Sequence, residues 1–177
     1  MRAVVGLGNP GPEYAATRHN AGYWLADALV ARWGFPPFRR GERARFTEGE
    51  LDSVPVRLLK PTTYMNASGA ALASLRADPA FNPATDLLVL VDEFRIPAGT
   101  SRLRSEGSAG GHNGLKSIEA ALQSQQYARL RIGVGPLPEG VSDWSEYVLA
   151  PFTPEQREQV EAVMPEMIEA VEQWLRA

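Results

Sequence analysis

The chain has 177 residues, enough for one domain that buries roughly 70% of the surface of its unfolded chain. It contains no cysteine, which excludes a thiol nucleophile, a thiolate zinc site and a disulfide framework. The net charge of −3 disfavours a protein that binds nucleic acid through overall charge, and the longest apolar run, residues 87–91, has the length of a buried strand and not of a membrane span. Since the N-terminal residues also lack the apolar region of a signal peptide, we expect a cytoplasmic protein with no membrane segment.

The predicted elements alternate between strand and helix along the chain. Short runs rich in Val, Leu and Ile that end in Gly or Pro indicate strands, and apolar residues that recur every three or four positions indicate helices. In chain order the sequence predicts a strand at 2–7, a helix from Asn20, an exposed connection at 32–46, a strand at 54–60, a helix from about Gly69, a strand at 86–92, an edge strand at 101–105, a helix after His112, a strand at 128–134 and a terminal helix at about 154–175. This alternation is typical of an α/β fold with a partly parallel sheet.

Charge is distributed unevenly along the chain. Residues 95–131 contain six Arg or Lys against two acids, a local balance of +4, whereas residues 137–177 contain nine acids against two Arg, a balance of −7. Such segments are either solvated faces of opposite sign or a basic surface for a negatively charged partner, and composition alone leaves both interpretations open.

The first predicted strand leads into Gly6-Leu7-Gly8-Asn9-Pro10-Gly11, which has the spacing of a dinucleotide-binding fingerprint. That kind of site needs a helix that begins at the third glycine, so that its N–H groups face the pyrophosphate. Here Pro10 and Pro12 remove two N–H donors, the helix pattern begins well downstream, and no acid follows at the end of a second strand. We therefore interpret the segment as a strand-exit loop that presents Asn9, Tyr14 and His19.

The only two histidines, His19 and His112, each lie between a loop and the start of a predicted helix. The helix dipole disfavours the imidazolium at such a position, so we expect a neutral ring that can accept a proton. Asp92 ends the most apolar strand and Asn66 follows another, and ligands of α/β sheets bind beyond the carboxyl ends of strands. These side chains form one site only if their loops share one rim of the sheet; otherwise they are hydrogen-bonded loop and capping residues.

A serine offers a different chemistry. The segment Glu106-Gly107-Ser108-Ala109-Gly110 is one residue short of the G-x-S-x-G nucleophile elbow of esterases. The first glycine is missing and several residues separate the segment from the preceding strand, so a loop serine is the favoured interpretation. A Ser108-dependent esterase that acts on small molecules is the alternative.

Five phrases of the sequence resemble bacterial peptidyl-tRNA hydrolases, in the same order and at matching separations. They are VGLGNPGPEYAATRHNAGYWLAD, LLKPTTYMNASG, LVDEFRIPAG, GSAGGHNGLKSI and YARLRIGVG. The resemblance runs from Met1 to about Gly135 and weakens afterwards. Members of this family hydrolyse the ester bond between the peptide and the 3′ end of tRNA, which releases the tRNA for reuse after premature termination of translation. The resemblance implies the same reaction here, with no metal and no organic cofactor.

The resemblance also implies a role for each residue that matches a family motif. His19 is expected to be the catalytic base that activates water, and Asp92 the carboxylate that orients it. The residues expected to bind the substrate, with the asparagines also stabilising the transition state, are Asn9, Tyr14, Tyr64, Met65, Asn66, His112 and Asn113. The residues expected to bind a tRNA phosphate are Arg104 and Arg131, with Arg102 as a neighbouring candidate.

The family architecture implies a single domain over residues 1–177, with a twisted mixed β-sheet that has a parallel core and helices on both faces. A lid segment is expected at about 136–152 and a C-terminal helix at about 154–175. The implied partner is peptidyl-tRNA, bound by a monomer through its 3′ CCA end and acceptor stem.

Two positions depart from the family pattern. Arg95 stands where an acid or polar residue is common, and Glu106 lies in a loop that is usually glycine-rich or basic. Both belong to the side of the chain expected to face RNA. A non-catalytic RNA-binding relative is the second alternative function, and the presence of His19, Asp92 and the asparagines favours the enzyme over it.

Overall fold

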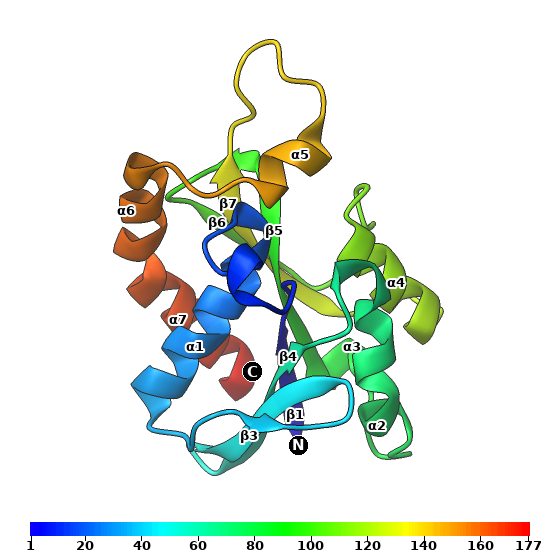
Figure 1. The fold of residues 1–177 in the computed structure, drawn as a ribbon. Helices are drawn as coiled ribbons and strands as arrows, with labels where there is room; N and C mark the ends of the chain where they lie inside the picture. The colour runs from blue at the N-terminus through cyan, green and yellow to red at the C-terminus, as the bar shows by residue number, and fades with distance from the viewer.

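The apolar segments predicted as strands form the centre of one seven-stranded sheet in a computed structural model that describes residues 1–177 (Figure 1). The four central strands are parallel, and they lie in the order β4 (Val54–Pro61), β1 (Arg2–Gly6), β5 (Leu87–Pro97) and β7 (Ala128–Gly135). The short strand β6 (Ser101–Arg104) pairs antiparallel with β7 at one edge. Nearly continuous apolar runs suit β1 and β5 because both faces of a parallel sheet are covered.

At the other edge, β3 (Ala44–Leu51) and β2 (Arg39–Arg40) extend the sheet with antiparallel pairing. The prediction of an exposed connection at 32–46 is therefore wrong for these residues. Half of the β3 residues, namely Ala44, Glu48, Gly49 and Glu50, belong to types that have little strand preference of their own. A two-residue hairpin turn pairs it with β4: Asp52 and Ser53 have φ angles of 49° and 68°, as primed hairpin turns require.

Helices cover both faces of the sheet (Figure 1). One face carries α1 (Ala21–Trp33), α6 (Pro154–Ala162) and α7 (Met164–Arg176). The other face carries the 3₁₀ segment η3 (Met65–Leu72), α2 (Ala73–Arg76) and α4 (Asn113–Leu122). The remaining short elements are η1 (Pro12–Tyr14), η2 (Arg18–Asn20), α3 (Pro83–Asp86) and α5 (Trp144–Leu149). The prediction of an α/β domain with a mixed sheet, a parallel core and helices on both faces is confirmed.

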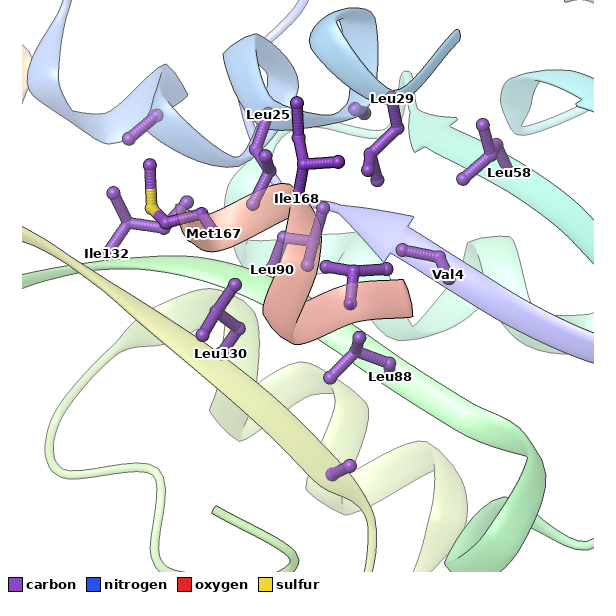
Figure 2. Close-up of a cluster of buried hydrophobic side chains, with 14 of the residues drawn as sticks. Val4, Leu25, Leu29, Leu58, Leu88, Leu90, Leu130, Ile132, Met167 and Ile168 are labelled. Atoms are coloured by element: carbon purple, nitrogen blue, oxygen red, sulfur yellow. The ribbon is translucent and has the colours of Figure 1, made fainter. Parts of the chain in front are cut away.

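A continuous apolar layer joins α1 and α7 to the sheet (Figure 2). Leu25 of α1, Leu90 of β5 and Met167 of α7 lie in it with no exposed surface. Burying each such side chain contributes about 1.5–3 kcal/mol, so this layer fixes the frame from which the loops above the sheet project.

The terminal helix predicted at about 154–175 is two helices in the structure. A capping box of Thr153 and Gln156 starts α6 at Pro154, which agrees with the predicted start, but α6 ends at Ala162 and α7 begins at Met164. Pro165 lies in the first turn of α7, where its missing N–H is tolerated, whereas inside one continuous helix it would remove a hydrogen bond and clash with the preceding turn.

The carboxyl ends of β1, β4 and β5 point to the same edge of the sheet, because these strands are parallel. Asn9 follows β1, Met65 follows β4 and Asp92 lies within β5, so three segments far apart in the sequence meet there. None of the helices combines the length and the apolar character needed to cross a membrane.

Candidate active site

Two histidines share one buried carboxylate at this edge of the sheet. His19 Nδ1 lies 2.8 Å from Asp92 Oδ2, and His112 Nε2 lies 2.8 Å from Asp92 Oδ1. The two imidazole rings are tilted with their centroids 5.0 Å apart. η2 delivers His19 immediately before α1, whereas His112 precedes α4, so the sheet and two different helices build this cluster.

Hydrogen bonds determine which nitrogen of each histidine carries a proton. His112 Nδ1 accepts from the backbone N–H groups of Gly114 and Leu115, at 3.1 and 3.3 Å, and so caps α4. The proton of a neutral His112 therefore lies on Nε2 and is donated to Asp92. Asp92 accepts in the same way from Nδ1–H of His19, which leaves His19 Nε2 without a proton whenever the ring is neutral.

The pKa of His19, which is paired with Asp92, is shifted in a direction that differs from the sequence prediction. Burial opposes protonation of the ring, but the charge and hydrogen bond of Asp92 outweigh burial and raise the pKa of His19 above its ordinary value of 6.5. Burial likewise disfavours the carboxylate form of Asp92, yet the two imidazoles hold its pKa well below its usual range. This direction is opposite to the one expected from a helix dipole, because the Asp92 carboxylate is in direct contact with the ring.

Asn9 is held in this cluster by Asn20, which is not among the predicted site residues. Asn20 accepts from the backbone N–H of Asn9 at 2.8 Å and donates to its backbone C=O at 3.0 Å. The Asn9 side-chain oxygen accepts from the backbone N–H of Met65 at 2.7 Å, so its NH₂ group is left as a donor for a ligand. Asn20 directly follows His19 in the sequence, and that adjacency was the one available signal.

A cavity of about 190 Å³ opens above His19. Six of the predicted site residues line it: Asn9, His19, Tyr64, Met65, Asn66 and Asn113. Tyr14 contacts Tyr64 edge to face, with ring centroids 6.3 Å apart, and Asp92 lies buried beneath His19. The spacing of these residues along the chain did not require them to meet, and the structure brings them together.

The opposite wall of the cavity comes from α5, whose Trp144, Val148 and Leu149 line it. The family resemblance implies this segment only as part of a lid. Arg18 ties it to the histidine loop: its side chain donates to the C=O of Tyr147 at 2.9 Å and its backbone N–H to the C=O of Ala150 at 3.1 Å. A larger cavity, of about 300 Å³ between β3, β4 and η3, contains none of the predicted site residues.

The basic residues lie together on β6 and β7 but differ in exposure. In the antiparallel pair, Arg102 stands opposite Arg131 and Arg104 opposite Arg129. Arg102 and Arg104 are exposed, whereas Arg131 donates to Glu93 at 3.1 Å and to the C=O of Ser108 at 2.9 Å. Arg129 was not predicted: it is fully buried and donates only to backbone C=O groups.

The structure gives Ser108 no catalytic partner. Both histidines are engaged with Asp92, and the Ser108 hydroxyl makes no hydrogen bond to either. Its backbone C=O is instead an anchor for Arg131. His19, Asp92 and His112 have ligand atoms within 4.8 Å of one another, a donor set that could hold a transition metal, but the hydrogen bonds between them already satisfy the carboxylate and orient both rings.

Known proteins of one family match this chain over almost its whole length. A sequence model of the family described as peptidyl-tRNA hydrolase matches residues 3–177. A peptidyl-tRNA hydrolase from Gemmatimonas aurantiaca is 48% identical over 177 residues, covering 99% of this chain and 93% of that protein, and one from Symbiobacterium thermophilum is 47% identical over 180 residues, covering 98% and 92%. The crystal structure of peptidyl-tRNA hydrolase from Acinetobacter baumannii is 31% identical and superimposes with a TM-score of 0.89, covering 99% of this chain and 89% of that one.

Proposed function

This chain belongs to the peptidyl-tRNA hydrolase family and hydrolyses peptidyl-tRNA, and we propose that His19, oriented by Asp92, is the base that activates the attacking water. The observation that carries this assignment is the 2.8 Å hydrogen bond from His19 Nδ1 to a buried carboxylate, at the floor of a cavity lined by three asparagines. The bond holds the ring so that Nε2 faces the cavity and can accept a proton from water.

The proposed reaction proceeds in two proton transfers. Water loses a proton to His19 Nε2 as its oxygen attacks the ester carbonyl carbon, and the carbonyl oxygen becomes an oxyanion. Collapse of this intermediate breaks the bond to the ribose oxygen of the tRNA, which takes the proton from the imidazolium. Asp92 stabilises the imidazolium in between, and the raised pKa of His19 reflects that stabilisation.

The asparagines supply donors for the charge that develops on the carbonyl oxygen. We assign this role to Asn9 and Asn113, because both line the cavity beside His19 and the oxygen of Asn9 is already used by Met65. Loss of one such donor typically lowers kcat about 10²–10³-fold. Tyr64, Met65 and Asn66 line the same cavity and are proposed to hold the 3′ CCA end and the attached residue, with Tyr14 behind Tyr64.

Residues 136–152 are proposed to form a lid over the peptide. Trp144, Val148 and Leu149 provide the apolar wall that a peptide side chain would contact. The end of this segment is fastened beside His19 through Arg18, and the backbone N–H of Phe152 donates to the C=O of Ala16. Opening of the lid would therefore be confined to the residues before α5.

The acceptor stem is proposed to lie along β6. Arg104 and Arg102 present exposed guanidinium groups there, and charge-assisted contacts of this type contribute about 1.5–3 kcal/mol each. Arg131 stands opposite Arg102 and would add positive charge to the same surface while it remains paired with Glu93. We propose that the enzyme acts as a monomer in the cytoplasm.

The test is release of free tRNA from N-acyl-aminoacyl-tRNA by the purified protein. His19→Ala should lower kcat by about 10²–10⁴-fold, the usual contribution of a positioned base, while Ser108→Ala should leave it unchanged. Tight tRNA binding without hydrolysis would show that the protein is a non-catalytic RNA-binding relative and not an enzyme. Activity that survives His19→Ala and disappears in Ser108→Ala would instead establish a serine esterase.

The phosphate assignment has its own test. Substrates with and without a 5′ phosphate are compared in wild type and in Arg104→Ala. The variant should raise KM for the phosphorylated substrate and leave KM for the other unchanged. An undiminished preference for the phosphate in Arg104→Ala would reject the proposed clamp.

A further inference from the structure

Arg95, the basic residue that departs from the family pattern, is connected to the catalytic cluster through the loop before His112. Its guanidinium is about half exposed, and Nη2 donates to the C=O of Gly110 at 2.9 Å. The same guanidinium pairs through Nη1 with Glu93 at 3.4 Å. Arg95 therefore joins a buried acid of β5 to the loop that ends in His112.

Glu93 is the centre of this network. Its side chain is 10% exposed, and its two oxygens pair with different arginines, Oε2 with Arg95 and Oε1 with Arg131. Arg131 donates in turn to the C=O of Ser108 at 2.9 Å. Two guanidinium groups, both fixed by one carboxylate, thus hold two carbonyls of the loop 108–111. Each uses two separate nitrogens for this, whereas a lysine would bring a single nitrogen to both partners.

That loop has a conformation that needs such support. The backbone N–H of His112 donates to the C=O of Ala109 at 3.0 Å, which closes a turn whose two central residues are Gly110 and Gly111. Both have positive φ angles, +59° and +87°, and glycine is the residue with the greatest freedom to leave such a conformation. The direction in which His112 leaves the turn decides whether its Nε2 reaches Asp92.

We infer that Arg95 is a positioning residue for the hydrolysis proposed above: by holding the Gly110 carbonyl it fixes the glycine turn that brings His112 to Asp92. The inference rests on the proposed role of the His19–Asp92 pair. When the turn is released, His112 no longer donates to Asp92 Oδ1, and the carboxylate that orients His19 loses one of its two partners. The consequence falls on the chemical step and not on binding of tRNA.

The opposing explanation for an exposed arginine in a basic stretch is direct contact with RNA phosphate. The two roles differ in what they require of the side chain. A phosphate contact needs only a positive charge near the surface, which lysine supplies, and its loss raises KM. Bridging Glu93 and Gly110 needs the two-nitrogen fork of arginine, and its loss lowers kcat.

Arg95→Ala and Arg95→Lys are compared with wild type on N-acyl-aminoacyl-tRNA. The matched control is Arg43→Ala, since Arg43 is similarly exposed, at 49% against 55% for Arg95, and pairs with one acid outside the site. We expect kcat to fall roughly 5- to 20-fold in Arg95→Ala, with KM within about twofold of wild type, and Arg95→Lys to recover little of the loss. Arg43→Ala should match wild type.

Spectra of the protein with ¹⁵N-labelled histidine provide a readout that loss of an RNA contact would not move. Without tRNA, the Nε2–H signal of His112 should report a hydrogen bond to Asp92 and slow exchange with water in wild type and in Arg43→Ala. In Arg95→Ala the same signal should shift and exchange faster with water, because that hydrogen bond is lost. Unchanged kcat, unchanged His112 spectra, or a defect confined to KM and repaired by lysine would each overturn the inference. Wild-type protein that fails to hydrolyse the substrate would refute the proposed function, whereas an active wild type with an equally active Arg95→Ala refutes only the role of Arg95.

Discussion

Replacing Asp92 by asparagine should inactivate the enzyme through the tautomer of His19 and not only through loss of charge. Asparagine keeps the shape of aspartate but offers one acceptor oxygen and one NH₂ donor, whereas Asp92 accepts on both oxygens. His112 cannot change its tautomer, because its Nδ1 already accepts from two backbone N–H groups of α4. The oxygen of the introduced amide would therefore face His112, and its NH₂ group would face His19 Nδ1.

This arrangement forces the proton of His19 onto Nε2, the nitrogen that has to accept one from water. Asp92→Asn should then lose most of the contribution of the base, about 10²–10⁴-fold in kcat, which corresponds to about 3–5 kcal/mol in the activation barrier. Single-turnover hydrolysis of N-acyl-aminoacyl-tRNA measures the chemical step directly. KM should change little, because Asp92 lies beneath His19 and does not line the cavity.

A second substitution tests the tautomer argument. His112→Ser keeps a residue that can cap α4 and removes the donor to Asp92 Oδ1. In the double variant with Asp92→Asn, the amide can rotate and present its oxygen to His19. We expect the double variant to be faster than Asp92→Asn alone. If the losses of the two single variants simply multiply, or if Asp92→Asn retains kcat near wild type, the reasoning is refuted.

Three further outcomes follow from the structure. The rate should decline on the acid side with an apparent pKa above 6.5, because the base acts in its neutral form and Asp92 raises the pKa of His19. An acid limb with an apparent pKa of 6.5 or lower would contradict this. Gly22→Ala should strongly destabilise the fold in urea titrations, since a Cβ there would lie 2.5 Å from the C=O of Leu90, and a normal midpoint would contradict the close packing of α1 on β5. Met167→Ala should cost about 2–5 kcal/mol of unfolding free energy, because it leaves a cavity in the apolar layer between α7 and the sheet. The kcat should change little, because Met167 does not line the cavity beside His19.

The local pattern of apolar residues in the sequence was sufficient to predict much of the fold. The strands β1, β4, β5 and β7 are apolar runs bounded by turn residues, and α1 has a clear apolar stripe, so their nature could be predicted before any contact was known. The strand β3 could not be predicted in this way, because its Glu and Gly residues have little strand preference and join the sheet through pairing with β4 across the Asp52–Ser53 turn.

For the site, too, some features could be predicted from the sequence and others depend on tertiary contacts. Sequence by itself determined which residue types were available: two histidines, an acid that directly follows a buried apolar run, several loop asparagines and no cysteine. It also excluded the dinucleotide fingerprint, because prolines in a loop have no N–H to offer a phosphate.

Only the tertiary structure decided how those residues are used. It joined His19, Asp92 and His112 through two 2.8 Å hydrogen bonds, which reversed the expected direction of the His19 pKa. It also paired Arg131 with Glu93 and showed what Arg95 holds. The physical reason is that charge and hydrogen bonding act over a few ångströms, and residues 73 positions apart in the chain come that close only after the parallel strands have set their carboxyl ends side by side.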